Sequence, residues 1–166
     1  MKNLSFNKRI DDLGRIVIPK EIRRKLKIED NENMEIYIND DEIIIKKHSL
    51  LKEKENNICN IGRIITGLTD KNIIITNREK IIYSSNKDYT NKEISDELKE
   101  YIINRQEIIG EKEIEIINSI KIKSFFISKN IIIDSDASGI VIIYNNEIND
   151  KDKIILDITS KLISYD

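Results

Sequence analysis

The sequence predicts an α+β protein made of two units, and three observations support this. Residues 1–47 contain two short β-branched segments, a short helical segment and two more strand segments, which gives the order ββαββ. From residue 58 onward, helical stripes alternate with isoleucine-rich strand segments. Between them lies a polar stretch. We therefore expect one unit at 1–48, a linker at 49–57 and a second unit at 58–166.

The first segment predicts a hairpin that leads into a short helix. Two β-branched runs, 9–10 and 16–18, flank the turn Asp-Asp-Leu-Gly at 11–14. Gly14 can adopt the positive φ that a tight hairpin loop often requires. Pro19 follows the second run and suits the first position of a helix, where a missing N–H has no cost. The aspartates of this turn are turn formers rather than an acid/base pair.

Two further strands complete the small unit. Apolar and polar residues alternate over 34–38, and three consecutive isoleucines lie within 42–46. A unit of this size without a disulfide or a metal rarely buries enough apolar surface to be stable alone. Its strand edges also need a partner. We therefore expect the amino-terminal unit to form a dimer.

Charge is unevenly distributed along the chain. The formal net charge is only −2, but bases dominate up to residue 27, and residues 28–42 contain acidic side chains without a base. This distribution predicts one cationic face for DNA, since the arginine fork fits phosphates and guanine edges. A run of bases taken alone could equally be the solvated face of a helix. The candidate DNA contacts are Lys8, Arg9, Arg15, Arg23 and Arg24.

The run from residue 9 to residue 24, RIDDLGRIVIPKEIRR, closely resembles the AbrB-type swapped-hairpin DNA-binding domain of bacterial transition-state and sporulation regulators. The resemblance implies a β-barrel homodimer in which two chains exchange hairpins, with double-stranded DNA as the partner. It also implies arginine contacts at Arg15, Arg23 and Arg24, and a basic pair at Lys8 and Arg9. Position 8 is lysine here where arginine is more usual.

The second unit predicts an α+β sandwich with its helices on one side. Thr90 and Glu93 have the spacing of a capping box and predict the start of a central helix. The order of elements resembles that of a GAF sensory domain, which implies a GAF-like α/β sandwich for sensing or oligomerisation. The expected helices are 58–68, one after Thr90, and 154–163; the expected strands are 72–76, 80–84, 114–117, 122–128, 131–134 and 140–144, with a hairpin turn at 134–139.

Few polar groups in this unit could orient a small ligand. The candidates are Ser84, Ser85, Ser124, Asp134 and Ser135, although turns and strand ends also favour these residue types. Metal-ligand spacings and phosphate-binding glycine loops are missing from the sequence. We therefore expect no enzyme activity, no metal and no known cofactor, while an unidentified small-molecule ligand stays open. Cys59 fits a helix interface better than a thiol sensor.

The two long helices, 58–68 and 154–163, are apolar over wide stripes. We expect them to pair between subunits, so that two dimers form a homotetramer. No apolar run approaches the roughly 18 to 20 residues of a membrane span, and the amino terminus lacks the apolar core of a signal peptide. The single cysteine excludes an intramolecular disulfide. The prediction is a cytoplasmic, nucleoid-associated protein without a membrane partner.

The sequence thus favours a sequence-specific DNA-binding transcription regulator, and the resemblance adds sporulation as its setting. An AbrB-fold antitoxin that neutralises a toxin is the main alternative. Such antitoxins use short, extended carboxyl segments, whereas residues 58–166 have the periodicity of a folded unit. An enzyme that acts on cyclic nucleotides through the GAF-like half is a weaker third option.

Overall fold

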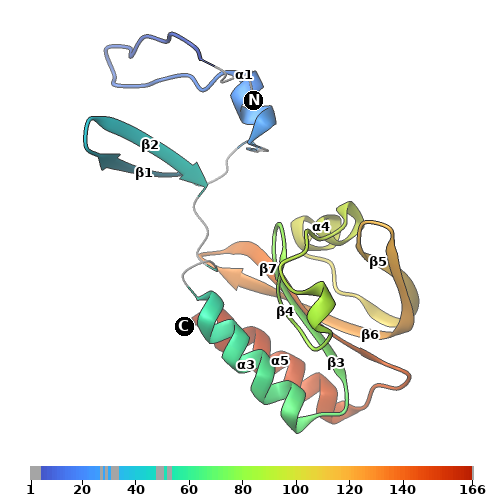
Figure 1. Cartoon of the computed structure of the whole chain (residues 1–166). Coiled ribbons are helices and arrows are strands. Elements are labelled where there is room, and N and C mark those ends of the chain that lie inside the picture. Colours follow the sequence, from blue (N-terminus) through green and yellow to red (C-terminus); the bar gives the residue numbers. More distant parts are fainter. Residues whose placement is uncertain are drawn as a thin grey trace. The chain divides into compact units, whose positions relative to one another are not determined.

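The computed structural model describes residues 5–26, 28, 30, 34–47, 51 and 54–165. The chain divides into two compact units, Met1–His48 and Ser49–Asp166. The elements of both are labelled in Figure 1. His48 and residues 49, 50, 52 and 53 of the expected linker lie outside the described residues.

The amino-terminal unit contains one helix and one two-stranded sheet. Helix α1 (Lys20–Lys25) begins directly after Pro19 and buries none of its side chains. Strands β1 (Met34–Asn39) and β2 (Glu42–Lys47) pair antiparallel, with Ile36 opposite Ile45. Asp40 makes the reversal between them with a φ of 49°. The strands predicted at 34–38 and 42–46 are confirmed.

The turn predicted at 11–14 is also formed. Gly14 has a φ of +75°, and its N–H donates to the carbonyl of Asp11 at 2.9 Å. However, the runs at 9–10 and 16–18 do not form strands in the single chain. The chain runs out and back as an open loop before α1 (Figure 1). A strand needs a neighbour to satisfy its N–H and C=O groups, and the described residues of one chain supply none to this hairpin.

A five-stranded antiparallel sheet forms the carboxyl-terminal unit, with the strand order β4-β3-β7-β6-β5. The predicted order of helix, two strands, helix, antiparallel strands and closing helix is confirmed. The elements are α3 (Glu55–Leu68), β3 (Asn72–Asn77), β4 (Ile81–Ser84), a 3-10 turn η1 (Lys87–Tyr89), α4 (Asp96–Ile103), β5 (Ile109–Ile117), β6 (Ile120–Ile133), β7 (Asp136–Asn145) and α5 (Asp150–Tyr165).

Helices cover both faces of this sheet, so the prediction that they lie on one side is wrong. Helices α3 and α5 pack on one face, where Ile73, Ile75 and Val141 are buried. Helix α4 packs on the other face over Ile74 and Ile142, and Figure 1 shows it opposite α3 and α5. Because neighbouring residues of a strand point to opposite faces, the buried run 73–75 of β3 requires two covered faces.

Four local predictions need correction. The linker expected at 49–57 is too long, because α3 begins at Glu55 rather than at residue 58, and Leu51 is 1% exposed within the core of the carboxyl-terminal unit. The capping box at Thr90 does not start the central helix. Ser95 caps α4 instead, since its Oγ accepts a hydrogen bond from the Leu98 N–H at 3.0 Å.

Strand β6 joins the two segments expected at 122–128 and 131–134 into one strand, which ends at Ile133. The reversal into β7 is therefore tighter than the turn expected at 134–139. Asp134 and Ser135 make it with φ values of 50° and 66°, and Asp136 already belongs to β7.

Helix α3 approaches β4 closely at Gly62. A Cβ atom at this position would lie 2.3 Å from Cδ1 of the Tyr83 ring. The Tyr83 hydroxyl is also held, because it donates to Oγ1 of Thr66 at 2.9 Å. Gly67 lies in the same helix, and no heavy atom within the described part of the chain would be within 4 Å of a Cβ there.

We predict that Gly62→Ala destabilises the carboxyl-terminal unit by about 1–3 kcal/mol, because the added methyl group overpacks the α3–β4 contact. Gly67→Ala is the matched control. It should be neutral or stabilising by about 0.5 kcal/mol, since alanine favours the same helix. Urea unfolding followed by circular dichroism measures both. Equal effects of the two substitutions would contradict the packing argument.

Helix α5 is tied to β6 by charge as well as by apolar contacts. Asp157 accepts from Nζ of Lys129 at 2.5 Å and from Nζ of Lys161 at 2.7 Å. These hydrogen bonds, first that of Lys129 and then that of Lys161, lower the pKa of Asp157 from 3.8 to about 2. The folded state therefore favours the ionised carboxylate, and this contribution to stability is lost as pH falls from about 4 to about 2.

We predict that Asp157→Asn lowers the urea midpoint at pH 7 and that its difference from the wild type shrinks as pH falls toward 2. The effect should be small because all three side chains are partly exposed. Asp134→Asn is the control, because asparagine tolerates the positive φ at that exposed turn. A pH-independent difference for Asp157→Asn would rule out the ionised carboxylate as its cause.

Candidate nucleic-acid interface

The loop at 11–15 is organised by one carboxylate. Oδ1 of Asp11 accepts from the N–H groups of Leu13, at 3.0 Å, and Arg15, at 2.8 Å. Oδ2 accepts from Nε of Arg15 at 2.7 Å. Hydrogen bonds from the Arg15 backbone N–H and then from its guanidinium lower the pKa of Asp11 below its usual value. The loop thus presents an Arg15 side chain that is 71% exposed yet held at its base.

Helix α1 contributes the second group of cations. Its last turn contains Arg23, Arg24 and Lys25. Nη1 of Arg23 pairs with Oδ1 of Asp30 at 2.9 Å, and the Asp30 side chain is 88% exposed. Such an exposed ion pair contributes little to stability, so it leaves Arg23 available to a stronger anionic partner. The side chain of Arg24 is exposed.

All five candidate DNA contacts therefore lie in the amino-terminal unit. Lys8 and Arg9 precede the turn, Arg15 follows it, and Arg23 and Arg24 lie on α1. An exposed loop and an exposed helix thus present them. Lys8 also lines a neighbouring groove, which its position in the sequence did not indicate.

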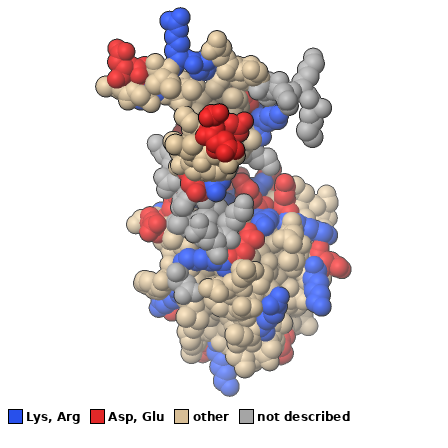
Figure 2. Space-filling model, turned by 60° about the vertical axis from the view of Figure 1, so that its left-hand side comes forward, with Lys and Arg blue, Asp and Glu red and all other residues tan. Residues whose placement is uncertain are grey.

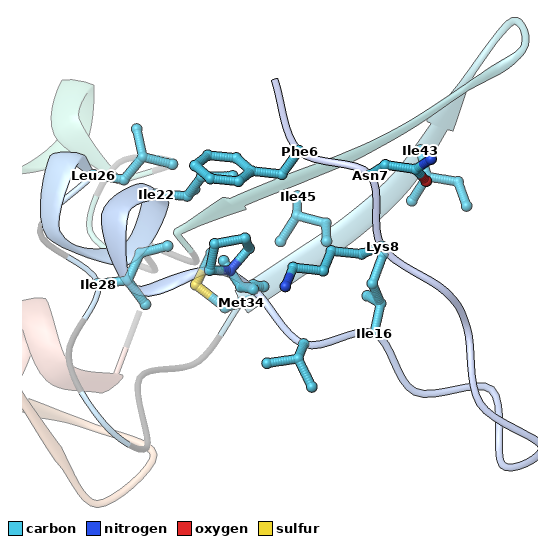
Figure 3. Close-up of a pocket in the computed structure, with 13 residues that line it drawn as sticks. Phe6, Asn7, Lys8, Ile16, Ile22, Leu26, Ile28, Met34, Ile43 and Ile45 are labelled. Atoms are coloured by element: carbon cyan, nitrogen blue, oxygen red, sulfur yellow. The ribbon is translucent and has the colours of Figure 1, made fainter. Parts of the chain in front are cut away.

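This groove is apolar and has a volume of about 380 Å³ (Figure 3). Asn7 and Lys8 are its polar lining residues. The apolar ones come from the chain before α1, from α1 itself and from β1 and β2; they are Phe6, Ile16, Val17, Ile18, Pro19, Ile22, Leu26, Ile28, Met34, Ile43 and Ile45.

Several large apolar side chains around this groove are open to solvent. Val17 is 74% exposed, Ile43 69% and Leu26 51%, although these residue types are usually buried. Figure 2 shows one face of the unit on which uncharged residues cover most of the surface. Exposed apolar side chains that lie together are typical of protein-contact sites. Sequence reasoning predicted a dimer from the small size of the unit but did not identify these residues.

The five candidate ligand residues of the carboxyl-terminal unit do not form one pocket. Ser84, Ser85 and Ser124 lie toward one end of the sheet, where Asn72 pairs with Tyr144. Asp134 and Ser135 lie in the β6–β7 turn at the other end. The hydroxyls also have local partners: Ser85 Oγ accepts from the Ile73 N–H at 3.1 Å, and Ser124 Oγ donates to the Asn145 carbonyl at 2.8 Å.

Metal and membrane features are also absent from the part of the chain that the structure describes. Its His, Cys, Asp and Glu side chains include no group of three or more that could hold a metal ion. None of its helices is long and apolar enough to span a membrane.

Sγ of Cys59 donates to the carbonyl of Ile82 at 3.6 Å, which fits the interface position predicted for it.

Comparison with known proteins places this chain in a family. Stage V sporulation protein T of Bacillus subtilis (strain 168) is 33% identical over 155 residues, which is 89% of this chain and 86% of that protein. The chain belongs to the family of stage V sporulation protein T and AbrB. Transition state regulatory protein AbrB of the same organism is 32% identical over 99 residues, or 59% of this chain and 94% of AbrB.

Two further matches were found, one to a family model and one to a solved structure. Residues 8–52 match the family model described as antidote-toxin recognition MazE, bacterial antitoxin. The cofactor-binding GAF domain of the nutrient sensor CodY from Clostridium difficile superposes with a TM-score of 0.43 at 11% identity, covering 88% of this chain and 92% of that one. The match to stage V sporulation protein T is longer than the amino-terminal unit, so the family relationship extends into the carboxyl-terminal unit. The predicted AbrB-type unit is confirmed, and the second unit is an α/β unit as expected; its GAF-like assignment stays a prediction.

Proposed function

We propose that this chain is a DNA-binding transcription regulator of spore development, and that its AbrB-type unit binds duplex DNA. The observation that carries the proposal is the group of exposed cations on one loop and one short helix of that unit. Family membership with a transition state regulatory protein and a sporulation protein supports it.

The chemistry of these cations suits a duplex. Arg15 and Arg24 can contact phosphates or guanine edges through their planar guanidinium groups, whereas Lys8 acts as a point charge. The net charge of −2 for the whole chain offers no general attraction to nucleic acid. Binding should therefore depend on this surface alone and should weaken steeply with salt.

The groove of the amino-terminal unit supports a dimer in which a second copy of this chain is the occupant. Among the residues that the structure describes, the hairpin at 9–18 has no strand partner, and the groove beside it exposes apolar side chains such as Val17 and Ile43. A second copy would supply both missing contacts, because it offers the same hairpin and the same groove. We propose that two chains exchange these hairpins.

Outward-facing residues of the carboxyl-terminal helices support a second contact. Ile64 and Leu68 of α3 are 62% and 78% exposed, and Ile158 and Leu162 of α5 are 52% and 53% exposed. Two different self-contacts would join two dimers into a tetramer. A small-molecule ligand of the GAF-like unit could regulate this assembly only if it bound two arrangements with unequal affinity.

An antitoxin is the second candidate function, because the model matched by residues 8–52 describes bacterial antitoxins. Against it, residues 54–165 form a unit with buried cores on both faces of a sheet, not an extended segment that could wrap a toxin. Co-purification of the full chain with a small toxic protein from its own host would favour this candidate over the regulator.

We predict that the wild type binds duplex DNA with a log K versus log salt slope of about −7, as expected if a dimer neutralises about eight phosphates. Arg24→Glu should weaken binding by at least about tenfold and flatten the slope. Lys151→Glu, at an exposed position of α5, is the matched charge reversal and should bind as the wild type does. Fluorescence anisotropy over a salt series measures all three. A wild-type slope near zero would refute the proposed interface.

We predict a tetramer in sedimentation equilibrium of the full chain, and dimers for Val17→Asp and for Ile158→Asp. Each substitution places a charge in one of the two proposed contacts, where no partner would compensate its desolvation. Combining the two should give a monomer. Ile109→Asp, at a 62% exposed isoleucine of β5 outside both contacts, is the control and should leave the tetramer intact. A monomeric wild type would contradict both contacts.

A further inference from the structure

Two carboxylates lie in the loop that is proposed to face DNA. Asp11 and Asp12 are adjacent, and both are exposed. Near a duplex each would repel phosphates, so a carboxylate here weakens binding unless it has another effect. Their contacts differ sharply. Asp11 makes the three hydrogen bonds within the loop, whereas the described residues offer Asp12 neither a hydrogen bond nor an ion pair.

Asp11 holds Arg15 by the base of its guanidinium group. The contact at 2.7 Å joins Oδ2 of Asp11 to Nε of Arg15. A guanidinium has five N–H donors, and this contact occupies only the one on Nε. The contact with Asp11 does not use the two Nη atoms, whose N–H donors can form the fork that contacts a guanine edge or a phosphate.

The same carboxylate also fixes the backbone from which Arg15 extends. Oδ1 accepts from the N–H groups of Leu13 and Arg15, and the Asp11 N–H donates to the Arg15 carbonyl at 3.1 Å. Gly14 completes the turn with its positive φ. Backbone and guanidinium of Arg15 are thus both positioned by one residue, four positions earlier in the chain.

We propose that Asp11 is a positioning residue for DNA recognition, which orders Arg15 in the free protein so that little side-chain freedom is lost on binding. Fixing a long side chain at an interface is unfavourable, and a group that is already ordered avoids this. The inference rests on the proposed function, since it assigns a role within the same DNA-binding surface. In a dimer the effect occurs twice, once at each loop.

The competing explanation is that Asp11 weakens DNA binding instead of supporting it. If Asp11 merely competes with DNA for Arg15, its removal should strengthen binding, as should removal of Asp12. The two explanations therefore predict opposite signs for the same loss of one negative charge. This opposition makes a pair of neighbouring substitutions decisive.

The test compares Asp11→Asn with Asp12→Asn in the full chain. Asparagine at position 11 keeps an oxygen that can accept from the backbone N–H groups of Leu13 and Arg15, but its amide nitrogen cannot accept from Nε of Arg15. The probes are the duplex that the wild type enriches most strongly from a random library and a scrambled duplex of equal length and composition. Affinities are measured by anisotropy at one fixed salt concentration.

We expect Asp11→Asn to bind the selected duplex about tenfold more weakly than the wild type, although it removes a negative charge, and to discriminate less against the scrambled one. Asp12→Asn should bind each duplex as tightly as the wild type does, or more tightly. In an Arg15→Ala background, Asp11→Asn should no longer weaken binding, because the residue through which it acts is missing.

Each other outcome overturns the inference. If Asp11→Asn and Asp12→Asn behave alike, the carboxylate does not position Arg15. If Asp11→Asn weakens binding equally with and without Arg15, its role is confined to folding of the loop. A wild type that enriches no duplex overturns the proposed function itself and the inference with it, which separates the two failures.

Discussion

The amino-terminal unit cannot bury its own apolar side chains, and the proposed architecture depends on this constraint. One six-residue helix and a two-stranded sheet leave Val17, Ile38 and Ile43 largely open to water. At about 25 cal/mol per Å² of apolar surface, a second copy that covered this groove would add a substantial part of the stability that such a unit lacks. Assembly and DNA binding are then coupled, since the groove is lined by residues next to the cationic loop.

The carboxyl-terminal unit meets the same requirement within one chain. Its sheet has isoleucine on both faces, and helices cover each of them. Two buried hydroxyls on the α4 side have partners within the unit: Ser128 Oγ accepts from the Ile108 N–H at 2.7 Å, and Ser95 Oγ donates to the Glu115 carbonyl. The exposed apolar residues of this unit include several on the outer sides of α3 and α5, such as Leu68 and Leu162. The two units thus differ: the amino-terminal unit leaves the apolar side chains of its groove exposed, whereas the carboxyl-terminal unit buries a core on each face of its sheet and exposes apolar side chains only outside these cores.

Sequence patterns predicted most elements but not how they cover one another. Alternation and isoleucine runs located β3, β4 and β7 because side-chain periodicity is a local property. Helices on both faces were missed, although the uninterrupted run at 73–75 was a signal for two covered faces. Leu51 was assigned to a linker because a pair of leucines at 50–51, followed by charged residues, shows no helical or strand period, and only tertiary packing makes Leu51 part of the core. Thr90 and Ser95 both precede residues with a helical pattern. The helix begins after Ser95, whose hydroxyl also donates to the Glu115 carbonyl of β5.

The candidate site shows the same division. Its cations could be predicted from the motif, because the sequence itself gives the residue types and their spacing. The proposed role of Asp11 could not be predicted, because the sequence shows two adjacent aspartates of the same type. Only the folded loop shows that the carboxylate of Asp11 contacts Leu13 and Arg15. An Asp followed three residues later by Gly was the available signal, and it indicated a turn without indicating that Arg15 is held by it.

The continuity of β6 gives the carboxyl-terminal unit a mechanical property. This single strand pairs with β5 along its first part and with β7 along its last part. Helix α5 is fastened to it by the Lys129–Asp157 ion pair and by the Ile132 N–H, which donates to Ser164 Oγ at 3.2 Å. A displacement of α5 would therefore act directly on β6, the strand that also pairs with the edge strand β5.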